Sequence, residues 1–177
     1  MASENDQRTD ESLMEQVQAG EEAAFAELFS RYRLPLYGYI RRMVHRGEVA
    51  DELFQDSFLN VHRFRSSWKP GQSSFRAWLF RIATNLIRDK GRALQRRPEL
   101  LSDSLQVTVP HGDPLSKMAL ERALSQLPDN LRDAFLLGAL EGLDHHELAL
   151  ALSIEPDNAR ARLSRARSRL RELLEYA

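Results

Sequence analysis

The sequence predicts an all-α protein made of two small helical domains. Gly and Pro are sparse, at 8 and 7 of 177 residues, so little interrupts long helices. Apolar residues recur at three- and four-residue spacing along most of the chain, which is the period of an amphipathic helix. That period is lost over residues 96–113. We therefore expect a first domain at 1–95, a flexible linker at 96–113 and a second domain at 114–177.

The first domain is predicted to contain four helices. Their expected bounds are 12–19, 21–44, 48–64 and about 74–94. Pro35 should kink the second helix, because an interior Pro removes a hydrogen bond and clashes with the preceding turn. The Pro-Gly pair at 70–71 separates the third helix from the fourth, for which Ser73 or Ser74 is a suitable N-cap. Trp78 lies beside the apolar stripe of the fourth helix, so we expect it in the core.

The second domain is also predicted to contain four helices. Their expected bounds are 114–126, 129–140, 144–152 and 156–174. Turn-forming residues at 127–129 and 141–144 separate the first three. No strand pattern and no internal repeat competes with this interpretation.

Charge is strongly segregated, although the formal net charge is only −1. Residues 1–30 carry eight acidic residues and one Arg, and residues 99–157 carry eleven acidic residues and three basic ones. Residues 61–97 carry ten Lys or Arg and one Asp, and residues 158–177 carry six Arg and two Glu. Because phosphate attraction depends on local charge, the two basic blocks indicate two places where a polyanion binds.

Several classes of function are disfavoured. The absence of Cys excludes disulfides, thiolate zinc sites and a Cys nucleophile. His145 and His146 are adjacent, so they diverge on a helix and do not form the zincin pair, which needs two His four residues apart. We expect no metal, no cofactor and no enzyme activity. We also expect no membrane insertion and a cytoplasmic protein, because neither a signal peptide nor a bilayer-spanning run is seen.

Residues 144–174 have the layout of a helix-turn-helix, in which the second helix enters the DNA major groove. One face of that second helix is apolar, and the other combines small residues with flanking Arg, which lets base edges approach while cations reach phosphate or guanine. An Arg-rich solvated helix is the alternative, but the adjoining helix, the turn length and Pro156 favour DNA contact. The residues expected to bind DNA are Asn158, Arg160, Ala161, Arg162, Ser164, Arg165 and Arg167.

A basic stripe also runs along the fourth helix of the first domain. Arg81, Asn85, Arg88 and Arg92 are three or four residues apart and therefore share one face. Before this helix lies a polar loop that carries Trp68 and Lys69. Cations along a backbone track with aromatic and polar groups nearby are typical of single-stranded nucleic-acid binding, and for Trp68 we favour a role in function over one in packing.

The third helix has a polar face with one isolated apolar residue. Glu52, Gln55, Asp56 and Leu59 lie on it. Such a face is often only solvated, but a single Leu among acidic residues is also typical of a polar protein–protein interface.

The second domain carries Leu127-Pro128, His146-Glu147-Leu148-Ala149 and the Arg-rich run at 160–167, and the first carries the segments at 50–59 and 75–85. Through these motifs both domains resemble those of extracytoplasmic-function (group four) sigma factors of bacterial RNA polymerase. Where the family commonly has Gly-Thr-Val-Lys-Ser, this chain has Asp-Asn-Ala-Arg-Ala at 157–161. In the first domain the segments at 50–59 and 75–85 are similar to the family's polymerase-binding and promoter-melting helices.

The resemblance implies a role for each surface. The second domain would recognise the minus-thirty-five promoter element, and the third helix would dock on the clamp helices of the polymerase's largest subunit. The flap of polymerase and an anti-sigma factor are further implied partners. The residues implied in minus-ten recognition are Trp68, Lys69, Arg76, Arg81, Ile82, Asn85 and Arg88, and those implied in polymerase binding are Asp51, Glu52, Gln55, Asp56 and Leu59.

Two other classes of protein remain open. A helix-turn-helix regulator with an unrelated N-terminal sensing domain would bind duplex DNA tightly by itself, whereas a sigma factor needs polymerase. A sigma mimic that sequesters an anti-sigma factor should lack a complete DNA-binding helix, and this chain keeps its Arg residues.

Overall fold

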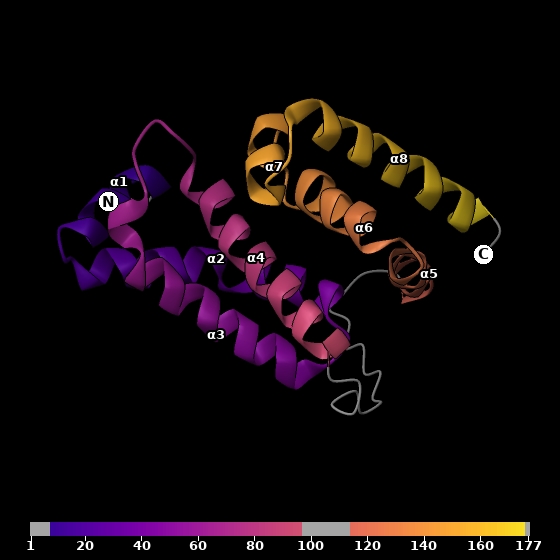
Figure 1. Ribbon diagram of the computed structural model, residues 1–177, viewed down its shortest axis with the longest axis horizontal. Coiled ribbons are helices and arrows are strands. Elements are labelled where there is room, and N and C mark those ends of the chain that lie inside the picture. Colours follow the sequence, from indigo (N-terminus) through magenta and orange to yellow (C-terminus); the bar gives the residue numbers. More distant parts are fainter. Residues whose placement is uncertain (1–7, 97–113, 176–177) are drawn as a thin grey trace, which may run out of the picture.

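A computed structural model of the chain describes residues 8–96 and 114–175, and every regular element within these residues is a helix. The helices form two groups, which are coloured indigo to magenta and orange to yellow in Figure 1. We refer to them as the N-terminal module (8–96) and the C-terminal module (114–175). The predicted all-α, two-domain fold class is confirmed for these residues. Most of the expected linker, 97–113, lies outside the described residues.

The N-terminal module contains four α-helices and one short 3-10 turn, close to the expected bounds. They are α1 (Asp10–Gln18), α2 (Glu22–Met43), α3 (Gly47–Arg63), η2 (Arg65–Ser67) and α4 (Phe75–Arg96). Thr9 caps α1, because its hydroxyl accepts a hydrogen bond from the Ser12 amide at 3.1 Å. Ser74 caps α4 in the same way through the Ala77 amide, also at 3.1 Å. Helix α2 continues through Pro35.

The core of the N-terminal module is formed by the apolar faces of all four helices. Trp78 is only 9% exposed, which confirms its expected place in the core. Buried hydroxyls in this core have partners: those of Tyr39 and Thr84 share a hydrogen bond of 2.9 Å, and that of Ser57 donates to the Leu53 carbonyl at 2.7 Å. The largest fully buried side chains of this module are Trp68, Tyr39, Phe75, Phe80, Leu13, Met14, Leu28, Leu36, Ile40 and Leu79.

The C-terminal module contains four α-helices and a π-helical turn. They are α5 (Pro114–Ser125), α6 (Asp129–Phe135), η4 (Leu136–Leu140), α7 (His145–Leu152) and α8 (Pro156–Glu175). The helix expected at 129–140 thus changes to π geometry over its last five residues. Next to this turn, α8 approaches closely: a Cβ added to Gly138 would lie 2.9 Å from a methyl carbon of Leu163.

Helices α7 and α8 form the expected helix-turn-helix. A capping box starts α7: the Asp144 carboxylate accepts from the Glu147 amide, and the Glu147 carboxylate accepts from the Asp144 amide. Ser153 ends α7 in the left-handed conformation at φ 55°, which turns the chain into α8. The buried face of α8 includes Ala159, Ala166 and Leu170, as the sequence predicts.

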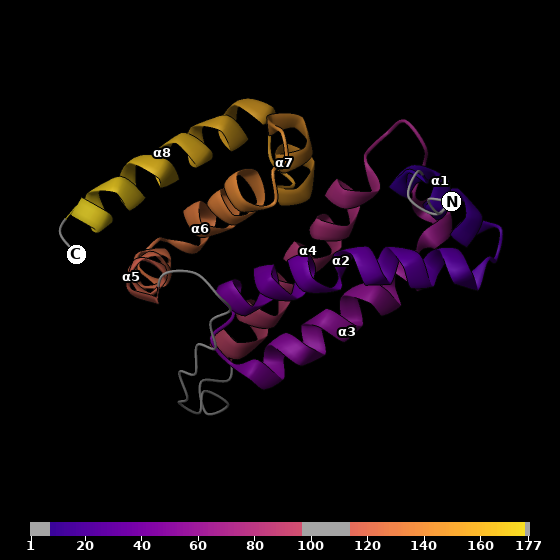
Figure 2. The ribbon, with the colours of Figure 1, turned by 180° about the vertical axis from the view of Figure 1, so that it is seen from behind.

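The two modules lie side by side and contact each other through α4 and α7, as the two opposite views in Figures 1 and 2 show. A second contact joins α2 to α5, where Arg42 and Glu121 form an ion pair at 2.9 Å. In the described parts of the chain, no helix combines the length and the apolar character needed to cross a membrane.

The buried guanidinium of Arg132 stabilises the C-terminal module through hydrogen bonds to main-chain oxygens. Its guanidinium, in a residue only 4% exposed, donates to the main-chain oxygens of Leu124, Ser125 and Leu127 at 2.9, 3.1 and 2.8 Å. Arg132→Met removes these donors. The Leu124 carbonyl keeps the Leu127 amide as a partner at 3.1 Å, but the Ser125 and Leu127 carbonyls lose a charged donor, so we expect the free energy of unfolding to fall by about 2–4 kcal/mol.

Chemical denaturation of both variants measures this effect. The matched control is Arg122→Met in the exposed part of α5, which we expect to change stability by less than about 0.5 kcal/mol. Equal effects of the two substitutions would contradict a stabilising role for the Arg132 hydrogen bonds.

Candidate functional site

The outer face of α8 carries the residues predicted to bind duplex DNA. Arg162 is half-buried, and its Nε donates to the Asn158 side chain at 3.2 Å. The other predicted residues are all exposed, namely Asn158, Arg160, Ala161, Ser164, Arg165 and Arg167. This face therefore offers small side chains and Arg to solvent, as contact with a groove requires.

Most contacts that the structure gives the cations of α8 lie within that helix, although Arg162 is also near enough to Asp133 of α6 to lower the pKa of that carboxyl. Arg165 donates to the Ala161 carbonyl at 3.3 Å, and Arg160 approaches Asp157 at 3.6 Å. Both ion-pair partners in the second contact are more than half exposed, so the pairing contributes little. The guanidinium groups can therefore exchange these contacts for phosphates at small cost.

A second polar surface runs along α4 and the loop before it. Arg81 and Asn85 are exposed one helical turn apart, Ile82 is half-buried beside them, and Lys69 is exposed in the loop. No hydrogen bond or ion pair is seen for the Asn85 side chain among the described residues. Its amide is therefore free to bind a ligand such as a base edge.

Trp68 differs from the expectation. The sequence favours a role in function over one in packing, but the Trp68 side chain is only 1% exposed and therefore packs in the core. The polar neighbours Ser66, Ser67 and Lys69 suggested exposure, but the η2 turn directs the indole into the core. The Trp68 carbonyl also accepts from the Gln18 amide at 2.8 Å. Trp68 therefore anchors the loop.

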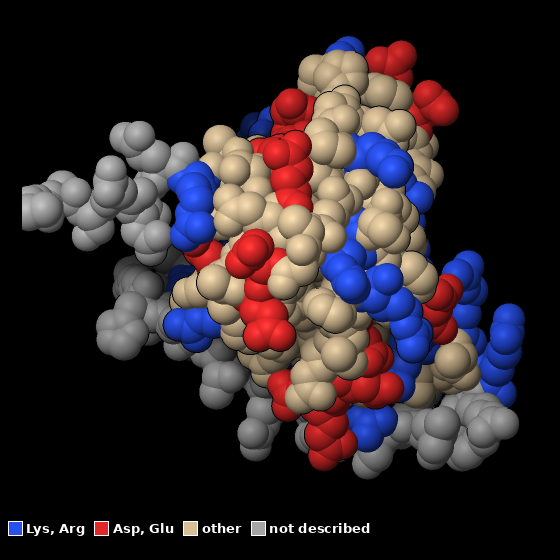
Figure 3. Space-filling model, turned by 90° about the vertical axis from the view of Figure 1, so that its left-hand side faces the viewer, with Lys and Arg blue, Asp and Glu red and all other residues tan. Residues whose placement is uncertain are grey.

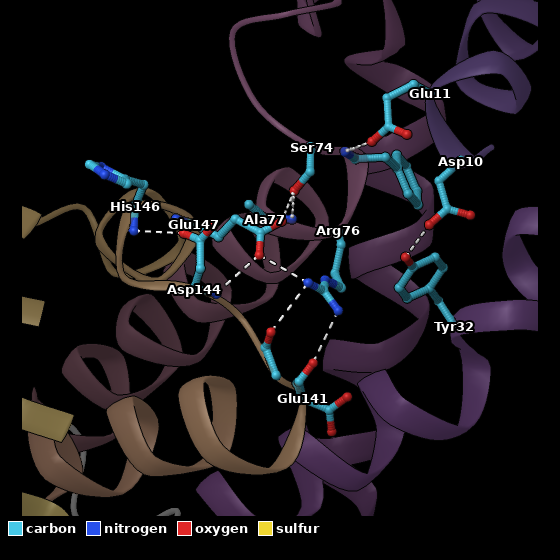
Figure 4. A network of polar contacts seen from close by, with 12 residues as sticks. Asp10, Glu11, Tyr32, Ser74, Arg76, Ala77, Glu141, Asp144, His146 and Glu147 are labelled. Carbon is cyan, nitrogen blue, oxygen red and sulfur yellow. Dashed lines mark hydrogen bonds and ion pairs between the residues drawn. The ribbon is translucent and has the colours of Figure 1, made fainter. Parts of the chain in front are cut away.

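Arg76 of α4 contacts the C-terminal module. Its Nη2 lies 2.9 Å from Glu147 Oε2, and its Nη1 donates to the Glu141 carbonyl at 3.2 Å. The Ser74 hydroxyl donates to the other oxygen of Glu147 at 2.6 Å. Figure 4 shows these groups converging from α4 and from the start of α7. In this conformation, one of the predicted minus-ten cations is already neutralised by a carboxylate.

Arg88, three turns further along α4, is held in the same way. It donates to the Leu152 carbonyl at 2.8 Å and to Asp133 Oδ2 at 3.2 Å. Burial raises the pKa of Asp133, although Arg88 acts against that rise. The resemblance implied a role for both residues in minus-ten recognition, but nothing in the sequence indicated that both face the other module.

Glu147 therefore has two functions at once. Its Oε2 accepts from the Asp144 amide at 3.1 Å, which completes the capping box of α7, and the same atom pairs with Arg76. Hydrogen bonds from the amides of Glu147 and His146 lower the pKa of Asp144 in return. The start of the helix-turn-helix and the contact between modules thus share one carboxylate.

The face of α3 predicted to bind polymerase is largely open. Asp51, Glu52, Gln55 and Leu59 are exposed, Leu59 to 65%, and Asp56 is half-buried. The hydroxyl of Tyr37 donates to Asp51 at 2.8 Å, and Lys90 pairs with Glu52 at 2.6 Å. Both partners lie within the N-terminal module, so this face does not depend on the contact between modules.

Two further features were missed from the sequence. On α1, Gln18 and Glu11 contact the segment between α3 and α4. In the C-terminal module, an apolar groove lies between α5, α6 and α8 and is lined mainly by Leu120, Phe135, Leu170 and Leu174. Helical periodicity could have suggested a face for the groove, but no local signal marks Gln18 or Glu11.

The acidic and basic blocks of the sequence also meet on the surface. Figure 3 shows the end of the molecule that carries α1, where acidic side chains run along the middle of the face and a group of Lys and Arg lies beside them. Within this region Asp10 pairs with Arg31 at 2.9 Å. The low net charge of the chain therefore hides local fields of both signs.

Comparisons with known families cover both modules. Residues 28–97 match the family described as Sigma-70 region 2, and residues 117–170 match Sigma-70, region 4. The RNA polymerase sigma factor CarQ of Myxococcus xanthus is 35% identical over 167 residues, which cover 91% of this chain and 95% of that protein. The ECF RNA polymerase sigma-E factor of Haemophilus influenzae is 34% identical over 179 residues, with 92% and 93% covered.

Two solved structures are similar as well. CnrH, in complex with the cytosolic domain of CnrY, has a TM-score of 0.73 at 27% identity, with 94% of this chain and 97% of that chain covered. RpoE of Bartonella quintana, in complex with the anti-sigma factor NepR, has a TM-score of 0.69 at 25% identity, with 84% and 97% covered.

Proposed function

We propose a division of labour among four surfaces of this chain, which belongs to the sigma-70 family as an extracytoplasmic-function sigma factor of RNA polymerase. As a sigma factor it binds the core enzyme and directs it to initiate transcription at promoters. The observation that carries the assignment is the match to both sigma regions, in order, in one chain. A regulator with an unrelated N-terminal domain does not fit, because residues 28–97 match sigma region 2.

Each surface has one role in this proposal. The open face of α3, which includes the exposed Leu59, docks on the clamp helices of the largest polymerase subunit. The exposed face of α8 binds the minus-thirty-five element as duplex. Arg81, Ile82 and Asn85 of α4, with Lys69 in the loop, open the minus-ten element and hold an unpaired base. The apolar groove of the C-terminal module receives the flap.

The domain bounds 1–95, 96–113 and 114–177 belong to the same proposal, as do a cytoplasmic location and an anti-sigma partner. Two relatives of known structure are bound to CnrY and to the anti-sigma factor NepR, which supports the last of these. The reaction chemistry resides in polymerase, so the chain itself needs no catalytic residue.

Arg76 and Arg88 are available to DNA only when their contacts with the C-terminal module are broken. Both pair with acidic groups of that module, Glu147 and Asp133. DNA phosphates and these carboxylates compete for the same guanidinium groups, so α4 reaches its full cationic strength only when the modules separate. The Arg76–Glu147 pair is partly exposed on both sides, so it is weak and is screened by salt. The Asp133 side chain is only 4% exposed, so its pair with Arg88 is the stronger contact that polymerase and promoter must break.

Glu147→Gln tests this condition. Gln also completes a capping box, so α7 keeps its cap while the charge opposite Arg76 is lost. We expect the affinity of the free chain for a fluorescent oligo(dT) strand to rise about twofold to fivefold, the equivalent of one weak ion pair.

The control for this prediction is Glu155→Gln, which makes the same charge change at an exposed position of the same module. An equal rise in both variants would indicate a general charge effect and would contradict competition at Arg76. Fluorescence anisotropy at low salt measures both affinities.

Run-off transcription tests the function itself. Core polymerase alone, and core polymerase with the purified chain, are given a library of genomic fragments. We expect discrete start sites only when the chain is present. Identical transcripts in the two reactions would overturn the assignment.

A further inference from the structure

Helix α1 contacts the start of the segment that joins α3 to α4. The side-chain amide of Gln18 donates two hydrogen bonds, to the carbonyl of Arg65 at 2.7 Å and to the carbonyl of Trp68 at 2.8 Å. Both donors of one amide are therefore used on the backbone of one turn. Because the Trp68 side chain is also buried, the chain leaves this point in a fixed direction.

The same helix contacts the end of that segment. Glu11 Oε1 accepts from the backbone amide of Phe75, the first residue of α4, at 3.2 Å. Figure 4 shows Glu11 over the start of α4, next to the Ser74 cap. Amides in the first helical turn have no partner within the helix, so a carboxylate there is favourable both as an acceptor and opposite the helix dipole.

Only the short stretch at 69–73 lies between these two anchors. Lys69, Pro70, Gly71 and Gln72 are exposed, and Gly71 adopts φ +80°, which favours Gly. This is the loop that the proposed function places against an unpaired base. Its tip is accessible while its two ends are held.

Helix α1 is itself fixed to α2, so it can act as a rigid support. Asp10 accepts from the Tyr32 hydroxyl with one oxygen and pairs with Arg31 through the other at 2.9 Å. The apolar face of α1, with Leu13, Met14 and Val17, is fully buried. Motion of α1 would therefore require loss of core packing.

We infer that α1 holds both ends of the base-binding loop in place, with Gln18 and Glu11 as positioning residues for minus-ten recognition. The inference rests on the proposed function of the loop. A loop whose ends are already ordered loses less conformational entropy when it closes on a base, and it holds the pocket in the geometry that distinguishes one base from another. Helix α1 lies before residue 28, outside the segment that matches sigma region 2.

Base discrimination is the readout that distinguishes positioning from simple stabilisation. A promoter recovered by run-off transcription is made in four versions, each with a different base at its most sensitive minus-ten position. The discrimination ratio is the transcription rate with the preferred base divided by the rate with the next best. Gln18→Ala is expected to lower this ratio about threefold to tenfold, the equivalent of one to two hydrogen bonds.

The chain offers matched variants for the other anchor. Glu11→Ala should lower the ratio in the same way, whereas Glu11→Gln keeps a carbonyl oxygen for the Phe75 amide and should retain most of it. Glu15→Ala, at an exposed position of the same helix, should leave it unchanged. An unchanged ratio in both Gln18→Ala and Glu11→Ala, with normal folding, would overturn the inference.

Hydrogen exchange of the free protein gives a test that needs no promoter. The Gln72 amide, which donates to the Lys69 carbonyl within the loop, should exchange faster in Gln18→Ala than in wild type or Glu15→Ala, while amides in the centre of α3 stay protected. If Gln18→Ala does not fold, the same measurement is made on Glu11→Ala. Equal exchange in all variants contradicts the positioning of the loop by α1, whereas failure of wild type to direct any transcript contradicts the proposed function instead.

Discussion

Replacement of Asn85 by Ala is expected to reduce promoter-dependent transcription about 10- to 100-fold, because one base-edge contact contributes about 1–3 kcal/mol. Asn85 is exposed on α4 and its side chain has no partner among the described residues. The fold therefore does not need its amide, and Ala is the better helix former. The loss should appear in open-complex formation, which permanganate footprinting of unpaired thymines measures.

The matched control is Gln95→Ala, which removes a second exposed amide from the same helix. This variant should transcribe at the wild-type rate. Artificial bubble templates, in which the minus-ten element is already unpaired, separate melting from base capture. A normal transcription rate for Asn85→Ala on duplex templates would contradict the proposed role of α4 in opening the minus-ten element.

Replacement of Leu59 by Asp is expected to weaken the affinity for core polymerase by about 30-fold or more, since an apolar hot spot contributes about 2 kcal/mol or more. Leu59 is 65% exposed and lies among acidic and amide side chains. Such a residue stabilises the free protein little but loses its exposed surface when a partner covers it. A carboxylate in its place would then be buried without a partner.

Leu34→Asp provides the comparison, because Leu34 is exposed to 68% in the same module but lies on α2. We expect both variants to fold and only Leu59→Asp to lose polymerase. Fluorescence anisotropy of labelled chain against core enzyme measures both. Equal losses would show that exposed Leu residues in general, and not the α3 face, support the complex.

The helices could be predicted because their main determinants are local. Apolar spacing, Ser74 as a cap and the Pro-Gly pair at 70–71 act within a few residues of the structure that they specify. The π turn at 136–140 could not be predicted, because no sequence feature there marks a change in backbone pairing. It lies where α8 approaches Gly138, which is a tertiary contact.

The surfaces of α3 and α8 were predictable for a similar reason. Residues such as Leu59 and Arg165 lie opposite a helix's apolar stripe, so the period that builds the core also exposes them. The burial of Trp68 could not be predicted, because its neighbours in the sequence are polar while α1, distant in the sequence, contacts this turn. The contacts of Arg76 and Arg88 with the C-terminal module could not be predicted either, because nothing in the sequence placed α7 against α4.

The most direct test of the division of labour is the affinity of the chain for core polymerase, measured side by side for Leu59→Asp, Asn85→Ala and Arg165→Ala. If the faces of α3, α4 and α8 act separately, only Leu59→Asp will bind core enzyme weakly, and the other two variants will bind like wild type yet fail to transcribe. Loss of core binding in Asn85→Ala or Arg165→Ala to the same extent as in Leu59→Asp would contradict the account.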